Sequence, residues 1–180
     1  REAILSVIRG VYRSHGFDEI ETPVAEDSER LHAGLGGDNE KLAFGILKRG
    51  LTRDDLQAAQ EPLDLADLGL RFDLTVPLAR FYATHRAELP SVFRSIQIAP
   101  VWRAERPQKG RYRQFVQCGI DLLGGPGPRA EAEVLVATPD AGDAPGLGGA
   151  VIRVQHRRPL IGMPAPLGFA AGEVDRAALP

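Results

Sequence analysis

The sequence predicts a mixed α/β domain, of the α+β kind, in which antiparallel strands pack with helices. Three observations predict it: an opening stretch with helical apolar spacing, two alternating runs joined by a turn-rich connection, and a helical stretch that follows a further alternating run. With 180 residues, 43% of them apolar and 26% charged, the chain can form one domain with a real core. A second full domain is not expected.

The opening helix is expected because apolar residues recur on one face at the spacing i, i+4, i+7, i+8. These residues are Ile4, Ile8, Val11 and Tyr12. Gly16 suits the position directly after a helix C-terminus. A short extended segment follows and ends at Thr22-Pro23.

The bulk composition narrows the classes of function and compartment. The formal net charge of −2 gives no general attraction to a polyanion, so any contact with nucleic acid must come from a local basic patch. Cys118 is the single cysteine, which excludes an internal disulfide and a cysteine-built metal site. A cytoplasmic setting is the expectation, since no apolar run approaches the ~20 residues that span a bilayer and no signal-peptide pattern is present.

The run from Leu70 to Thr75 alternates apolar and polar residues and is expected to be a strand. Alternation assigns its residues to two faces, core and polar: Leu70, Phe72 and Leu74 against Arg71, Asp73 and Thr75. Pro77 suits the first turn of a helix, so we expect this strand to lead directly into one.

A second alternating run spans Ala99 to Glu105 and places Arg103 and Glu105 on one face. Residues 106–112 are polar and contain Pro and Gly, as expected of a hairpin connection longer than the tight two-residue type. The return strand from Arg113 alternates between a polar face and a core face. The polar face carries Arg113, Phe115, Gln117, Gly119 and Asp121, and the core face carries Val116, Cys118, Ile120 and Leu122.

This pattern favours a site for a nucleotide and an amino acid. Five cations fall within eleven residues and would be offset by a polyphosphate, which guanidinium groups bind bidentately: Arg103, Arg106, Lys109, Arg111 and Arg113. Phe115 offers a flat partner for a purine, and Asp73, Gln117 and Asp121 can accept hydrogen bonds from an ammonium group and a ring N–H.

Structural alternatives remain open for each of these residues. The cations could form a solvated basic loop, and Asp73 and Asp121 could pair with Arg71 or Arg113. Gln117 could be a satisfied core amide, and Phe115 an ordinary core aromatic.

Residues 93–115 resemble motif 2 of class II aminoacyl-tRNA synthetases in the form found in the histidyl-tRNA synthetase family. The stretch Arg-Pro-Gln-Lys-Gly-Arg-Tyr-Arg-Gln-Phe at 106–115 is highly specific. Residues 70–80 resemble the family's histidine-side strand, and 16–23 resemble motif 1 at the dimer interface. The resemblance covers nearly the whole chain and implies a truncated, class II synthetase-like fold with a mostly antiparallel sheet flanked by helices.

The resemblance also implies a division of the chain as a single partial catalytic domain. Motif 1 covers about 1–26, an edge insertion covers 31–69, the motif 2 hairpin covers 93–123 and an incomplete C-terminal part covers 128–180. Both ends look cut, and the family's motif 3 arginine and anticodon-binding domain are not recognisable. The Gly- and Pro-rich stretch 139–149 is expected to be a loop.

Roles for individual residues follow from the resemblance alone. Arg103 would be catalytic and hold the α-phosphate of ATP. The remaining ATP contacts would come from Glu105, Arg111, Arg113 and Phe115, with Mg²⁺ bound through ATP and no protein ligand named. The histidine contacts would come from Asp73, Thr75, Gln117 and Asp121. The tRNA acceptor end would meet Arg106, Gln108 and Lys109.

The implied activity is that of a histidine–tRNA ligase, which activates histidine with ATP to histidyl-adenylate and transfers it to tRNA(His), as a homodimer through motif 1. We expect this chain alone to show little or no aminoacylation. The alternative is a paralogue that serves as the histidine-sensing regulatory subunit of ATP phosphoribosyltransferase. The retained cations Arg103 and Arg111 favour the enzyme, because a histidine sensor has no need of them.

Overall fold

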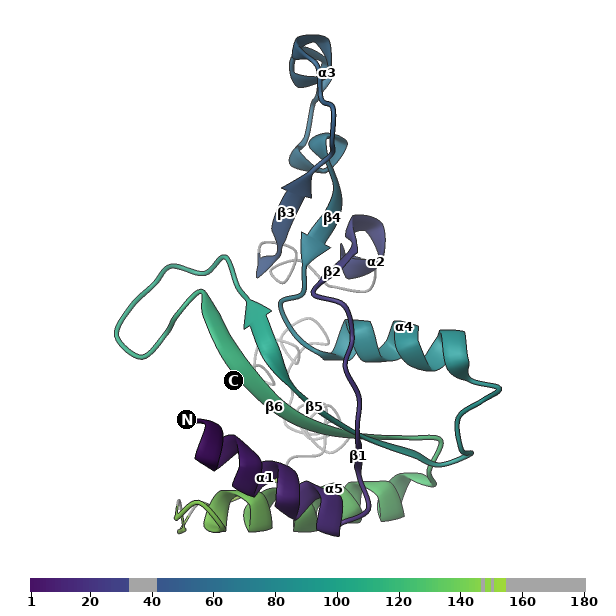
Figure 1. Cartoon of the computed structure of the whole chain (residues 1–180), viewed down its shortest axis with the longest axis vertical. Coiled ribbons are helices and arrows are strands. Elements are labelled where there is room, and N and C mark those ends of the chain that lie inside the picture. The colour runs from purple at the N-terminus through teal and green to yellow at the C-terminus, as the bar shows by residue number, and fades with distance from the viewer. Residues whose placement is uncertain (33–41, 147, 150, 155–180) are drawn as a thin grey trace, which may run out of the picture. The chain divides into compact units, whose positions relative to one another are not determined.

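The computed structural model describes residues 1–32, 42–146, 148–149 and 151–154 (Figure 1). The chain divides into two units, 1–148 and 149–180, and every helix and strand described below belongs to the first. The helices are α1 (Glu2–Ser14), α2 (Ser28–His32), α3 (Arg53–Ala58), the 3₁₀ helix η2 (Pro62–Leu65), α4 (Thr75–His85) and α5 (Gly127–Asp143). The strands are β1 (Asp18–Glu19), β2 (Ala25–Asp27), β3 (Phe44–Leu47), β4 (Ala66–Leu70), β5 (Phe93–Trp102) and β6 (Gln114–Leu123).

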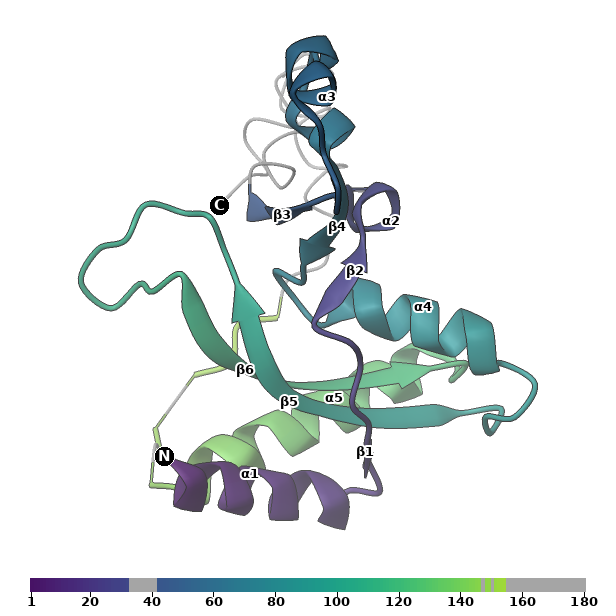
Figure 2. The same ribbon diagram turned by 45° about the horizontal axis from the view of Figure 1, so that its top comes forward.

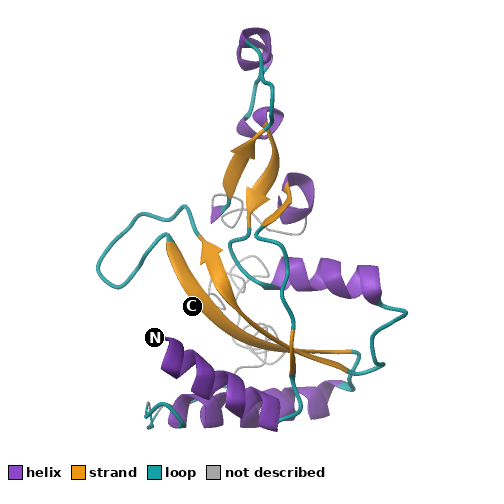
Figure 3. Cartoon of the chain, in the orientation of Figure 1, coloured by secondary structure: helices purple, strands orange, loops and turns teal. Residues whose placement is uncertain are grey.

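A sheet in the order β1-β5-β6 carries the long hairpin that the alternating runs predict. β5 and β6 pair antiparallel over ten residues each, with Val101 opposite Phe115 and Ser95 opposite Asp121, and β1 joins β5 in parallel. Helices flank the sheet, so the predicted fold class is confirmed (Figure 3). β5 begins at Phe93, earlier than the run from Ala99 that we expected.

Helices α1 and α5 lie side by side and cover one face of this sheet (Figure 2). The buried cluster there consists of Tyr12, Phe17, Ile96, Ala137 and Ala141. Ile8, Val11, Ile98 and Ile120 pack against it. The apolar faces predicted for the opening helix and for the return strand therefore meet in one core.

Gly16 ends α1 as expected, and it does so in a Schellman motif. Its φ of 81° lies in the left-handed region, its N–H donates to Arg13 O at 3.0 Å, and the Phe17 N–H donates to Tyr12 O at 3.2 Å. Because the chain reverses direction there, Phe17 enters the core at 1% exposure.

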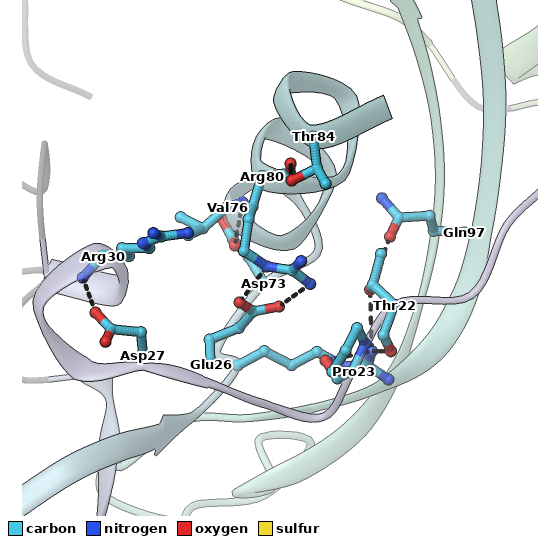
Figure 4. A network of polar contacts seen from close by, with 11 residues as sticks. Thr22, Pro23, Glu26, Asp27, Arg30, Asp73, Val76, Arg80, Thr84 and Gln97 are labelled. Carbon is cyan, nitrogen blue, oxygen red and sulfur yellow. Dashed lines mark hydrogen bonds and ion pairs between the residues drawn. The ribbon is translucent and has the colours of Figure 1, made fainter. Parts of the chain in front are cut away.

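A second sheet, in the order β2-β4-β3, is antiparallel throughout. Its strand β2 is tied to helix α4 by an ion pair between Glu26, only 3% exposed, and Arg80 (Figure 4). The guanidinium donates from Nε at 2.6 Å and from Nη2 at 2.9 Å, a bidentate arrangement. This pair ties the middle of α4 to the second sheet.

The strand predicted over 70–75 is wrong. β4 ends at Leu70, residues 72–74 form bends, and α4 begins at Thr75. The reason is local: Asp73 Oδ1 accepts from the backbone N–H groups of Thr75 at 3.2 Å and Val76 at 3.4 Å, which caps the helix and turns the chain. Pro77 lies in the first turn of α4 as predicted.

Arg71, expected on a polar face, is a buried cation at 2% exposure. Its Nε donates to Pro100 O at 3.0 Å and its Nη1 to Thr22 O and Pro23 O at 2.6 and 3.2 Å. No carboxylate of a described residue pairs with it, and burial lowers the pKa of the guanidinium. Arg71 therefore joins its own segment to residues 22–23 and 100 through backbone carbonyl groups and the Thr22 hydroxyl.

The side chain of Gln97 on β5 is 1% exposed and is hydrogen-bonded to the bent segment 71–75. Its Nε2 donates to Leu74 O at 2.9 Å, and its Oε1 accepts from Thr22 Oγ1 at 3.3 Å (Figure 4). The backbone N–H of Trp102 donates to the backbone carbonyl of Arg71 at 2.9 Å. The segment that replaces the predicted strand is thus fastened to β5 at several points.

The loop predicted over 139–149 is wrong for its first part, because α5 continues through Pro139 to Asp143. A proline inside a helix removes one backbone donor and leaves the carbonyl four residues earlier without its partner. That carbonyl belongs to Leu135, which is 38% exposed, so water can satisfy it. Residues 144–146 and 148–149 form turns.

Replacing Gly16 by alanine should lower the free energy of unfolding by about 1 kcal/mol, because a Cβ is strained at positive φ. The matched control is Gly10→Ala in the middle of α1, where no atom lies within 4 Å of an added Cβ. That control should raise stability by about 1 kcal/mol through helix propensity. Urea unfolding followed by circular dichroism measures both, and equal stabilities for the two variants would contradict the expectation.

Gln97→Leu should lower the free energy of unfolding by about 1 kcal/mol, since the Leu74 carbonyl keeps only its hydrogen bond from the Leu78 N–H and the buried Thr22 O–H loses its acceptor. It should also speed hydrogen exchange at the Thr75 and Val76 amides, which depend on the position of Asp73. Gln57→Leu, at an exposed site on α3, is the matched control and should change neither quantity. Unchanged exchange at Thr75 in Gln97→Leu would show that Gln97 does not hold this segment.

Candidate active site at the hairpin

The polar face of the β5–β6 hairpin lies opposite the core formed with α1 and α5. Phe115, Gln117, Gly119 and Asp121 alternate along β6 on this face, as predicted. The register places Val101, Ala99, Gln97 and Ser95 of β5 directly across from them, in that order. The polar face therefore combines side chains from both strands. The bent segment 71–75 lies against it, because Gln97 of β5 donates to Leu74 O.

Arg103 follows the last residue of β5 and is half-buried. Its Nε donates to Phe72 O at 3.1 Å, and its Cζ lies 5.1 Å from the centre of the Phe115 ring, within the range of a cation–π contact. The Arg103 N–H also donates to Arg113 O at 2.8 Å, which extends the hairpin by one pair. The structure therefore brings together the predicted catalytic arginine, the predicted stacking aromatic and the segment that carries Asp73.

The connection between β5 and β6 covers residues 103–113, so it is longer than a two-residue hairpin turn, as predicted, and a tight turn closes its tip. The Gln108 and Arg111 backbones exchange hydrogen bonds at 3.2 and 2.9 Å, and Gly110 takes a φ of 81° between them. The positive φ at the third position of the turn is the one that type II turns require. Lys109 and Gly110 are the two central residues of this turn, and both are exposed.

Glu105 organises the base of this loop. Its carboxylate lies 3.5 Å from Arg111 Nε, and its carbonyl accepts from Arg113 Nε at 3.4 Å. The Arg111 side chain is 57% exposed, so this ion pair is weak and can exchange partners. Three of the predicted ATP contacts thus lie within one short loop segment.

Asp73 and Asp121 come from segments far apart in the sequence, but their carboxyl groups are near enough for the charge of one to affect the pKa of the other. Burial raises the pKa of the Asp121 carboxyl, and the charge of Asp73 raises it further. Two carboxylates in one partly buried site repel each other, so the arrangement favours a cation between or beside them. The alternative pairing of Asp121 or Asp73 with Arg71 does not occur, because the Arg71 side chain donates to backbone carbonyls and the Thr22 hydroxyl.

Gln117 has a buried Oε1 atom with no hydrogen-bond partner among the described residues, so it is not a satisfied core amide. Ser95 Oγ, on the neighbouring strand, is buried and equally without a described partner. An unpaired buried acceptor costs free energy, and a donor supplied by a ligand would remove that cost.

The remaining predicted site residues are more exposed. Thr75 is exposed at the N-terminus of α4, beside its capping residue Asp73. Arg106, Gln108 and Lys109 are exposed on the hairpin loop. They are near one another in the chain, but the loop carries them beyond the end of the sheet (Figure 1).

Sequence reasoning missed Gln97 and Arg71 as supports of the site. Gln97 is a polar residue between Ile96 and Ile98 in the strand 93–102, and that interruption was a signal that could have drawn attention to it. Arg71 was assigned to a polar face because its burial among carbonyl groups depends on chain segments 22–23 and 100, which no local pattern places beside it.

Among the described residues, no group of three or more His, Cys, Asp or Glu side chains is placed to hold a metal ion. None of the helices that the structure describes combines the length and apolar character needed to cross a membrane.

Comparison with known proteins identifies the family. A family model for histidyl-tRNA synthetase matches residues 1–169. The histidine–tRNA ligase of Leifsonia xyli subsp. xyli is 66% identical over 180 residues, which cover 98% of this chain and 42% of that protein. A probable histidine–tRNA ligase of Tropheryma whipplei strain Twist is 52% identical over 168 residues, which cover 93% of this chain and 39% of that protein. The chain thus spans about two fifths of the length of these curated relatives.

Solved structures agree. The crystal structure of histidyl-tRNA synthetase from Nostoc sp. PCC 7120 superposes with a TM-score of 0.73 at 30% identity, over 97% of this chain and 35% of that one. A structure from Bacillus halodurans C, described as an ATP phosphoribosyltransferase regulatory subunit/histidyl-tRNA synthetase, gives a TM-score of 0.66 at 24% identity and shows the shared fold alone. From its hairpin, its fold and these matches, the chain belongs to the histidyl-tRNA synthetase family.

Proposed function

We propose that this chain carries the ATP and histidine sites of a class II histidine–tRNA ligase. The observation that supports this best is the meeting of two kinds of group on one sheet face. The Arg103 guanidinium lies over the Phe115 ring and donates to the carbonyl of Phe72. The next residue is Asp73, whose charge raises the pKa of Asp121. A cation for a phosphate and carboxylates for an ammonium group are what the joining of ATP to an amino acid requires.

On the ATP side, Arg103 binds the α-phosphate and stabilises the charge that develops when the histidine carboxylate attacks the phosphorus. The attack forms histidyl-adenylate and releases pyrophosphate. Phe115 stacks on the adenine, Glu105 meets the adenine edge, and Arg111 and Arg113 contact the remaining phosphates. The weak Glu105–Arg111 ion pair supports this, because its exposed guanidinium can turn to an incoming phosphate.

On the histidine side, Asp73, Thr75 and Gln117 hold the α-amino group and Asp121 holds the imidazole. The unpartnered Oε1 of Gln117 supports this assignment, since an ammonium N–H would satisfy it. The electrostatic conflict between Asp73 and Asp121 also supports it, because a cationic substrate would relieve the conflict.

Mg²⁺ would bind through the ATP phosphates and neutralise part of their charge. In the second half-reaction a ribose hydroxyl at the 3′ end of tRNA(His) attacks the adenylate carbonyl and releases AMP. Arg106, Gln108 and Lys109, exposed on the loop, are the proposed contacts to the acceptor end.

Motif 1 would supply a homodimer interface. Ile4 and Val7 on α1 are 50% and 40% exposed, and a subunit contact would bury such apolar surface. A cytoplasmic setting completes the proposal, since tRNA charging takes place there and Cys118 is unpaired.

Calorimetric titration of the chain with ATP–Mg²⁺ and, separately, with histidine tests the proposal. Both should bind, and Arg103→Ala should weaken ATP binding at least tenfold, because a charge-assisted pair to phosphate is lost. Arg53→Ala, which removes an equal charge from the exposed first turn of α3, should leave ATP binding unchanged. Histidine binding without any ATP binding would instead favour a histidine-sensing regulatory subunit.

The pH dependence of stability tests the carboxylate pair. Because the folded-state pKa of Asp121 is raised, its stabilising contribution is full below the unfolded carboxyl pKa and is lost as pH rises through the folded value. Asp121→Asn should therefore unfold at higher urea concentration than the wild-type chain at neutral pH, and this advantage should vanish in acid. The same variant should bind histidine more weakly. A variant less stable than wild type at neutral pH would contradict the repulsion between Asp73 and Asp121.

A further inference from the structure

Gly119 lies in the middle of β6, on the same face as Gln117 and Asp121, and opposite Gln97 of β5. A Cβ built at Gly119 would meet no atom within 4 Å in the part of the chain that the structure describes. Its φ does not lie in the positive range that favours glycine. Neither crowding nor backbone conformation therefore accounts for a glycine at this position.

A glycine inside a strand is unfavourable relative to alanine by about 0.5–1 kcal/mol, so a glycine without a structural reason marks a place where something else approaches the backbone. The polar groups on either side of Gly119 indicate the chemistry of a ligand that would approach the backbone there. Gln117, two residues before it, presents a buried acceptor without a described partner, and Asp121, two residues after it, presents a carboxylate.

The other side chains nearby leave the space open. Gln97, directly across on β5, is committed to Leu74 O through its Nε2 and to Thr22 through its Oε1. The Asp73 carboxylate is held by the Thr75 and Val76 N–H groups. Each of these groups is fixed by contacts of its own, so none of them is free to fill the volume above Gly119.

We propose that the open space above Gly119 receives the flat heterocyclic ring of the amino-acid substrate, which makes Gly119 a specificity-determining residue. The inference rests on the proposed function, and it adds that the shape of the histidine site depends on the missing side chain at position 119. With the α-amino group at Gln117, a planar ring whose N–H donates to Asp121 lies over β6 only while position 119 lacks a side chain. A single methyl group would stand where the ring must lie.

The test compares Gly119→Ala and Gly119→Val with the control Gly10→Ala, which adds a Cβ in open space on α1. Calorimetry should show histidine binding weakened at least tenfold in Gly119→Ala and lost in Gly119→Val, with ATP binding within twofold of wild type in both. Unfolding should show Gly119→Ala at least as stable as wild type. A glycine needed only for folding would give the reverse: reduced stability with unchanged affinity for histidine in the folded chain.

A second measurement separates this inference from the proposed function. In the ¹⁵N-labelled wild-type chain, imidazole and histidine should each shift the Gly119 amide resonance. Histidine binding that leaves the Gly119 amide unmoved, or that persists in Gly119→Val, would overturn the inference while the function stands. An imidazole shift at Gly119 without histidine binding would support the ring site and overturn the proposed function. No shift with either compound would overturn the inference whatever ATP binding shows.

Discussion

The Arg71 guanidinium is a buried positive charge whose hydrogen bonds join its own segment to neutral groups of two others, at Thr22–Pro23 and at Pro100. Burying a charge is costly unless hydrogen bonds compensate for the lost water, so these segments cannot separate without exposing an unsatisfied cation. The three segments are the end of the extended stretch after α1, the bend before α4, and β5. The position of everything on the polar face of the hairpin depends on their staying together.

How far local pattern predicts structure differs between the two halves of this site. The hairpin was predicted well, because alternation over two long runs determines which residues share a face, and a slip of one residue would turn Cys118 and Ile120 away from the core. The run 70–75 alternates equally well but is no strand. There the Asp73 carboxylate competes for the backbone N–H groups, and Gln97 holds the Leu74 carbonyl from another strand.

The same contrast applies to the site residues. Arg103 and Phe115 are close in sequence and lie on paired strands, so their proximity could be predicted from pairing alone. Asp73 and Asp121 lie in different elements, and the alternating pattern grouped them through a strand at 70–75 that the structure does not contain. Gln97 and Arg71 are given no contact with a proposed substrate. Their importance lies in contacts with residues distant in the chain, which a local pattern cannot contain.

The contacts of Arg103 have a consequence for the entropy of binding. A free arginine side chain loses up to about 2 kcal/mol of rotamer freedom when it is immobilised. Here the Phe72 carbonyl and the Phe115 ring already hold the guanidinium, so most of that loss is incurred during folding. A phosphate that arrives at this arginine meets a donor whose direction is already set, and less of the energy of the new contact goes into ordering the protein.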